Sequence, residues 1–106
     1  MKDGTYQYAV AMTVPRGTRN GDLHIAVRKG TVTGYLTMFT NTLPILRGIC
    51  AGRGISFIGE MKTISEAIAY TAEGTVSPTR LKLVFHTERG DYPAIGSQTV
   101  IDPRRT

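Results

Sequence analysis

The sequence predicts an all-β domain, an antiparallel up-and-down barrel of eight strands. Apolar and polar residues alternate over most of the chain, which is the period of a half-buried strand. The connections are short, because eight strands in 106 residues leave about 13 residues for each strand with its connection, too few for parallel crossovers. When the chain is shifted by 49 residues, apolar positions superpose, as Tyr8 on Phe57 and Met12 on Met61. We therefore expect two similar halves of four strands each.

The first strand is expected from Thr5 to Val14, followed by a hairpin. One face of this strand is apolar and consists of Tyr6, Tyr8, Val10, Met12 and Val14. Pro15-Arg16-Gly17 ends the strand, and Asn20-Gly21 is interpreted as a turn because this dipeptide readily takes positive φ.

The second and third strands continue the alternation, and Lys29-Gly30 turns the chain between them. Their inner faces are Leu23, Ile25 and Val27, and then Val32, Gly34, Leu36 and Met38. Asn41-Thr42 is expected to form the next turn, before a fourth strand from Leu43 to Cys50. In that strand Arg47 shares parity with Ile45 and Ile49, so the alternation holds only if a β-bulge at Gly48 resets it.

The second half repeats this plan after Ala51-Gly52-Arg53-Gly54. Its inner positions are Ile55, Phe57, Gly59 and Met61, then Ile68, Tyr70, Ala72 and Gly74, then Leu81, Leu83 and Phe85, and finally Ala94 and Gly96 in a strand from Tyr92 to Val100. Its turns are expected at Ile64-Ser65-Glu66, Ser77-Pro78-Thr79 and Arg89-Gly90-Asp91. The even spacing favours a barrel closed by the first and eighth strands, and the alternative is a two-sheet sandwich.

The turn glycines and strand pattern also carry a family resemblance. Val14-Pro15-Arg16-Gly17 and Asn20-Gly21 are followed by Gly30 and Gly34, and then by Ile55-Ser56-Phe57-Ile58-Gly59. This pattern covers nearly the whole chain and resembles a bacterial family of small calycin-like (lipocalin-like) barrels of eight strands. The resemblance implies a fold rather than an activity, although similar proteins occur beside or fused to flavin-dependent oxidoreductases. The chain departs from the family at Arg16, where methionine is common, and at Ile64-Ser65-Glu66, where a second proline-glycine turn would lie.

Composition describes one globular domain over residues 1–106. With 41% hydrophobic and 20% charged residues, the chain is unlike a disordered or membrane protein. No apolar run approaches the roughly 20 residues that span a bilayer, and the first residues lack the hydrophobic stretch of a signal peptide. The single cysteine, Cys50, fits a reducing compartment. We expect a cytoplasmic protein with no membrane partner.

The net charge of +5 raises the question of a nucleic-acid partner. The basic residues are scattered over separate turns and the tail, such as Arg16 with Arg19, Arg28 with Lys29, and Arg104 with Arg105. Nucleic-acid binding would require the arginines to converge around an aromatic platform. A solvated surface with no nucleic-acid partner is therefore expected.

Residues for catalysis do not converge in the predicted fold. His24 and His86 both lie on outward positions of strands that are not neighbours, and the carboxylates lie in turns, at strand ends or on outward positions. Cys50 is interpreted as a small buried hydrophobe rather than a reactive thiolate. We expect no catalytic residue, no metal site and no cofactor, and therefore no enzyme.

The barrel interior is the first candidate binding site, because eight strands enclose either a filled core or one small molecule. An apolar or aromatic ligand would contact a predicted wall of Tyr8, Met12, Leu36, Phe57, Tyr70 and Phe85. Arg47 would anchor such a ligand if it pointed inward, where a lone charge needs a partner. With a bulge in the fourth strand, Arg47 is instead a surface charge.

The outer face is the second candidate, because several large apolar residues break its polar alternation. These residues are Tyr35, Phe39, Ile58, Val84 and Ile95. A symmetric homodimer would cover such a patch with one surface on both subunits. The alternative function is thus a structural or oligomerisation module, with its interface at Ile58, Val84 and Ile95, accessory to another protein such as a flavin-dependent oxidoreductase.

Overall fold

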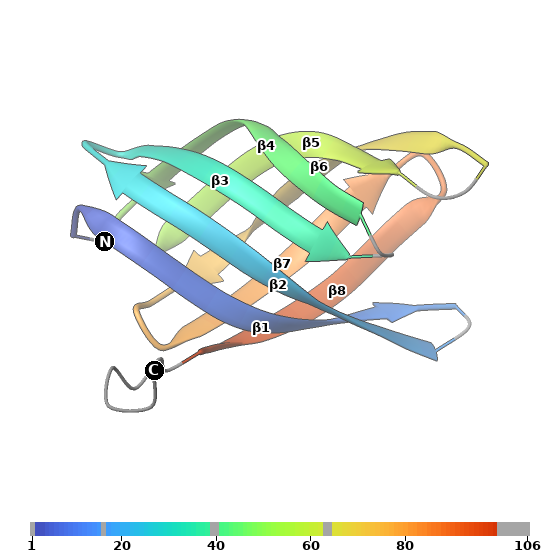
Figure 1. The fold of residues 1–106 in the computed structure, drawn as a ribbon, viewed down its shortest axis with the longest axis horizontal. Helices are drawn as coiled ribbons and strands as arrows, with labels where there is room; N and C mark the ends of the chain where they lie inside the picture. Colours follow the sequence, from blue (N-terminus) through green and yellow to red (C-terminus); the bar gives the residue numbers. More distant parts are fainter. Residues whose placement is uncertain (1, 16, 39–40, 63–64, 100–106) are drawn as a thin grey trace.

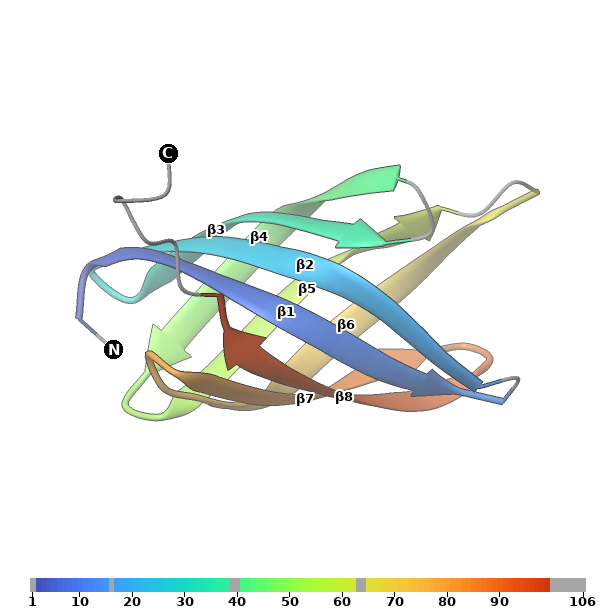
Figure 2. The same cartoon turned by 60° about the horizontal axis from the view of Figure 1, so that its bottom comes forward.

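Eight antiparallel strands close into a barrel in the computed structural model, which describes residues 2–15, 17–38, 41–62 and 65–99 (Figure 1). The strands are β1 (Gly4–Val14), β2 (Gly17–Arg28), β3 (Thr31–Met38), β4 (Asn41–Ala51), β5 (Gly54–Lys62), β6 (Ala67–Val76), β7 (Arg80–Thr87) and β8 (Gly90–Gln98). Each strand pairs with its sequence neighbours, and β8 pairs with β1 from Tyr8↔Gln98 to Met12↔Ala94 (Figure 2). The predicted fold class is confirmed, and closure excludes the two-sheet sandwich.

The strand bounds confirm the two similar halves. Adding 49 to the bounds of β3 gives those of β7, and the other three strands of the first half match their counterparts within one or two residues. Equivalent inward positions are buried in both halves, as at Tyr8 and Phe57 or at Leu36 and Phe85. The shared apolar pattern therefore corresponds to one structural plan used twice.

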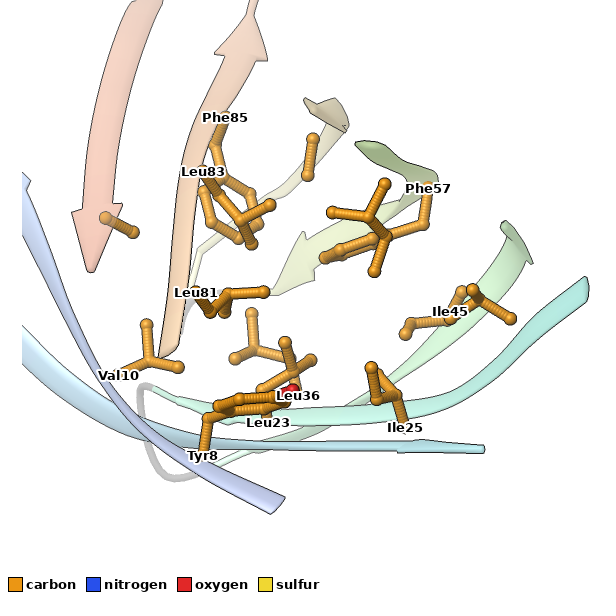
Figure 3. Close-up of a cluster of buried hydrophobic side chains, with 14 of the residues drawn as sticks. Tyr8, Val10, Leu23, Ile25, Leu36, Ile45, Phe57, Leu81, Leu83 and Phe85 are labelled. Atoms are coloured by element: carbon orange, nitrogen blue, oxygen red, sulfur yellow. The ribbon is translucent and has the colours of Figure 1, made fainter. Parts of the chain in front are cut away.

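The inward residues of all eight strands form the core (Figure 3). The largest fully buried side chains are Tyr8, Phe57, Phe85, Met12, Leu23, Leu36, Leu43, Leu83, Val27 and Val32. Tyr6, Val14 and Tyr92 are partly buried against this core. Because successive side chains point to opposite faces of a strand, strict alternation brings these residues to the inside.

Lys29-Gly30 forms the predicted turn, but two other turn predictions are wrong. Both Lys29 and Gly30 have positive φ, 49° and 80°, as a tight two-residue hairpin loop requires. Asn20-Gly21 lies inside β2, opposite Ala11 and Val10. A Cβ on Gly21 would lie 2.3 Å from the Thr37 carbonyl oxygen, so this glycine permits the close approach of β3.

Asn41-Thr42 is the second wrong turn, because both residues pair with β3 as the first residues of β4. The eighth strand begins at Gly90, two residues before the predicted start, and its description ends before Val100. Arg16, Phe39, Ile64 and residues 100–106, on which other predictions fall, lie outside the described residues.

The predicted bulge exists in β4 but lies before Gly48. The register with β5 shifts between Ile45 and Arg47, so Leu46 and Arg47 are both exposed and Gly48 is buried. Ile49, which would point inward without a bulge, is 62% exposed. One inserted residue has this effect because the side-chain period of a strand is two.

The barrel has two ends, and one of them carries the turns that follow β2, β4 and β6, on the left of Figure 1. Backbone hydrogen bonds join these turns to the neighbouring strands: the amide groups of Cys50, Val76 and Gln98 donate to the carbonyls of Gly30, Arg53 and Thr79, each at 2.8 Å. Turns that are far apart in the sequence thereby become neighbours. No helix in the described part of the chain is long and apolar enough to span a bilayer.

Candidate functional site

Six of the seven predicted ligand-binding residues come together inside the barrel. Tyr8, Met12, Leu36, Phe57, Tyr70 and Phe85 are each at most 3% exposed. The rings of Phe57, Tyr70 and Phe85 meet edge to face, with centroids 5.1 to 6.1 Å apart. These are the contacts of a packed aromatic core. The predicted wall residues thus contact one another and occupy much of the interior.

Arg47 does not join this group. The bulge in β4 places it on the outside of the barrel, opposite Ile58 of β5, and its side chain is exposed. The alternative in which Arg47 anchors a ligand within the barrel is therefore wrong, because the inserted residue turns its side chain outward. It is a surface charge.

The two buried tyrosines differ in their hydrogen bonds. Tyr8 Oη donates to the Ser77 carbonyl at 2.6 Å, whereas Tyr70 Oη has no hydrogen-bond partner within the described residues. Burial raises the pKa of Tyr70 to about 12. Burial, and then the neighbouring Tyr6 and Cys50, raise the pKa of Tyr8 to about 12. Both phenols are therefore neutral, and that of Tyr70 is an unused donor inside the barrel.

An apolar area, here termed the outer patch, consists of Leu46, Ile49, Ile58 and Val84 on the outside of β4, β5 and β7. Leu46 and Ile49 are 62% exposed and Ile58 is 40% exposed. Two surface grooves of about 830 and 620 Å³ contain these residues, with Leu46 and Ile58 in one and Ile49 and Val84 in the other. His86 borders both grooves.

The outer patch shares two residues with the predicted interface, lacks one predicted residue and contains two that were not predicted. Ile58 and Val84 belong to it, whereas Ile95 lies in another groove with Arg53 and Arg80. Leu46 and Ile49 were not among the predicted surface residues, because the position of the bulge decides which way they face. In the sequence, Ile45-Leu46 and Arg47-Gly48 break the strict alternation of apolar and polar residues. This break was the signal for the position of the bulge.

His86 connects three strands at the edge of the outer patch. Its Nδ1 lies 2.9 Å from Asp91 Oδ1 on β8, and its Nε2 lies 3.0 Å from Glu73 Oε1 on β6. Hydrogen bonds to Asp91, and then to Glu73, raise the pKa of His86 above its ordinary value. Only the protonated ring donates to both carboxylates at once. With both ring nitrogens engaged, His86 links β7 to its two neighbouring strands, β6 and β8.

Side chains for a metal centre do not gather on the described strands and turns, where no group of three or more histidine, cysteine or acidic residues has a suitable arrangement. Cys50 is buried at 8% exposure, as predicted. Arg89 forms an ion pair with Glu66, which ties the turn before β8 to the start of β6. These polar contacts stabilise the barrel surface.

Known proteins add nothing to this geometry. No family model, no curated protein and no solved structure matches the chain. The functional proposal below therefore rests on the core and on the surface of the barrel.

Proposed function

We propose that the chain is a non-catalytic β-barrel module that forms a homodimer through the outer patch. The observation that carries this proposal is the exposure of Leu46, Ile49 and Ile58 together on β4 and β5. Single exposed apolar residues are ordinary, but a contiguous group around two grooves is typical of an interaction surface. Membership of the calycin-like barrels, and an accessory role beside a flavin-dependent oxidoreductase, are parts of the same proposal that come from the sequence resemblance.

The charges around the outer patch favour a second copy of the chain as the occupant. Arg47 lies opposite Ile58 of β5 on one side, and Glu73 lies opposite Ser56 of β5 on the other. Two strand spacings across the sheet and two residues along β5 separate them, which is about 12 Å. A two-fold axis over β5, midway between these residues, brings Arg47 of each copy to Glu73 of the other. Such self-complementarity is what a two-fold symmetric interface requires.

Ile58 lies close to this axis, so one substitution changes both sides of the interface at once. In native mass spectrometry and sedimentation, the protein should have twice the chain mass of 11.6 kDa. Ile58→Lys should weaken the dimer roughly 100-fold, since about 1.4 kcal/mol lost on each side multiplies to that factor. Ile95→Lys is the matched control, because Ile95 is 64% exposed but lies in a different groove.

Two results would contradict the dimer. One is a wild-type protein that stays at the mass of a single chain at about 100 μM, a concentration at which even weak dimers form. The other is an equal loss of association in Ile58→Lys and Ile95→Lys, which would reflect added charge rather than a specific surface.

One observation favours the second candidate function, a carrier of a small apolar or aromatic ligand. The unpartnered Tyr70 Oη lies over Gly59, where an added Cβ would be 2.6 Å from it. A guest with a hydrogen-bond acceptor would satisfy this phenol. Native mass spectrometry of gently purified protein tests this function as well, because a bound guest adds mass that is released on denaturation. A bare chain mass under the same conditions would argue against a resident ligand.

A further inference from the structure

Basic side chains gather at the end of the barrel that carries the turns after β2, β4 and β6. This basic rim consists of Lys2, Arg28, Lys29, Arg53, Arg80 and Lys82. Among the described acidic residues, Asp3 is the one at this end, where its Oδ1 accepts a hydrogen bond from the Lys29 backbone amide at 3.0 Å. Charges that are scattered in the sequence are thus brought together by the antiparallel order of the strands.

Of the six other described carboxylates, Glu73 lies two residues along β6 from Thr75, the partner of Lys82, and the others lie at the middle or the opposite end of the barrel. The six are Asp22, Glu60, Glu66, Glu73, Glu88 and Asp91. Among the described residues, six of the ten lysines and arginines lie at the rim, so positive charge is concentrated at this end of the barrel. A polyanion that approaches the protein is directed to this end.

A flat aromatic platform lies beside the rim, on the outside of β2 and β3. His24 and Tyr35 face each other across the two strands and stack, with ring centroids 4.5 Å apart and planes at 18°. Tyr35 is 40% exposed, so the stacked pair leaves part of its ring surface to solvent. A surface groove of about 450 Å³ surrounds the platform and includes the amide side chains of Gln7 and Gln98.

The platform and the rim form one continuous surface. On one side, Arg28 follows His24 by four residues on the same outward parity, which is about 13 Å along β2. On the other side, Gln98 of the groove follows Ser97, which pairs with Arg80 of the rim. The Thr99 amide donates to the Gln7 carbonyl at 2.9 Å and joins the two edges of the groove. Arg28 and Lys29 therefore lie at the end of the strand that carries His24, and the groove continues across β1 to β8.

We propose that this surface binds single-stranded nucleic acid, with a base stacked on Tyr35 and phosphates on Arg28 and Lys29. Aromatic side chains within a basic groove are the recurring features of proteins that bind unpaired strands. Gln7 and Gln98 carry both donors and acceptors for base edges. A base in a duplex is already stacked on both faces and does not reach such a platform. An anionic membrane would bind the basic rim without any use of Tyr35.

Fluorescence anisotropy with a labelled oligothymidine of about fifteen nucleotides tests the proposal, at about 50 mM and about 200 mM salt. Tyr35→Ala should weaken binding about tenfold, whereas Tyr35→Phe should retain it, because the stacking ring is kept. Arg28→Ala should weaken binding severalfold and reduce its salt dependence. Arg19→Ala is the matched control, since Arg19 is an exposed arginine of β2 towards the opposite end of the barrel.

The outcomes separate this proposal from general charge attraction and from membrane binding. Binding that disappears at the higher salt and does not differ between wild type and Tyr35→Ala would overturn it. Equal effects of Arg28→Ala and Arg19→Ala on binding would also overturn the proposal. Sedimentation with vesicles containing phosphatidylserine, in the absence of oligonucleotide binding, would assign the rim to a lipid surface instead. Circular dichroism of each variant verifies the fold, and Tyr35→Leu, which removes the ring but keeps an apolar side chain, keeps the test decisive if Tyr35→Ala is unstable.

Discussion

Removal of the Tyr70 hydroxyl should stabilise the barrel, whereas removal of the Tyr8 hydroxyl should destabilise it. Both rings are buried in the core, with 3% and 0% exposure, so a tyrosine-to-phenylalanine change deletes one oxygen and keeps the ring. The two oxygens differ in their partners: Tyr8 Oη donates to the Ser77 carbonyl at 2.6 Å, and Tyr70 Oη has no acceptor on the described residues. The same chemical change should thus have opposite signs at the two sites.

The size of each effect follows from the cost of burying a polar group. A buried hydroxyl without a partner costs about 1–3 kcal/mol relative to its hydrated state. Tyr70→Phe should therefore raise the free energy of unfolding by about 1 kcal/mol, after allowance for the small void that replaces the oxygen. Tyr8→Phe should lower it by about 1 kcal/mol, the net value of a typical hydrogen bond. For a domain of this size, each change shifts Tm by about 4 °C or more.

Urea denaturation followed by circular dichroism measures both variants against wild type, with the slope of the transition as a check that the unfolded state is unchanged. The reasoning would be refuted if Tyr70→Phe lowered the free energy of unfolding by more than about 0.5 kcal/mol, because the phenol would then be making a favourable hydrogen bond. A neutral Tyr8→Phe would likewise show that its contact with Ser77 does not stabilise the fold.

Two further predictions concern β6 and β7. Gly74→Ala should lower the free energy of unfolding by about 3 kcal/mol, because the new Cβ would lie 1.9 Å from the Lys82 carbonyl oxygen and force β6 away from β7. Gly54→Ala is its control in the same melts, since the nearest atom to that Cβ is at 3.4 Å, and equal stability of the two variants would contradict the expected clash. Stability should also depend on the protonation of His86, whose pKa is raised in the folded state by Asp91 and then Glu73. Because the folded pKa lies above the unfolded value of 6.5, this contribution is complete below that pH and is lost as the pH rises through the folded pKa. Melts from about pH 6 to about pH 8 should show the decline in wild type and not in His86→Gln, and parallel profiles would exclude the ion-pair link.

Alternation predicted the eight strands and nearly all of their inner faces, because one face of each strand packs on a single core. It predicted the turns less well. Asn20-Gly21 is a strong local turn signal, yet Gly21 is required where the Thr37 carbonyl approaches within a strand. A short motif does not reveal which of these two uses of glycine applies, since the second depends on a strand that comes later in the sequence.

The candidate surfaces were predicted only in part, for a similar reason. The bulge in β4 is fixed by pairing with β5, and a displacement of one residue moves Ile49 from the inside to the outer patch. The basic rim needs turns such as those at Lys29 and Arg53, which become neighbours only after the barrel closes. Local patterns describe one strand at a time and therefore miss features that several strands form together.

The two halves of the barrel have a glycine at the same paired position, but on different strands. In the first half Ile25 of β2 faces Gly34 of β3, and at the equivalent position of the second half Gly74 of β6 faces Leu83 of β7. Each glycine leaves room for a carbonyl oxygen that would be 1.9 Å from a Cβ, that of His24 in one half and Lys82 in the other. Each of these two strand pairs thus needs one residue without a side chain, and either strand of the pair can provide it. Two halves with different sequences can therefore have the same shape.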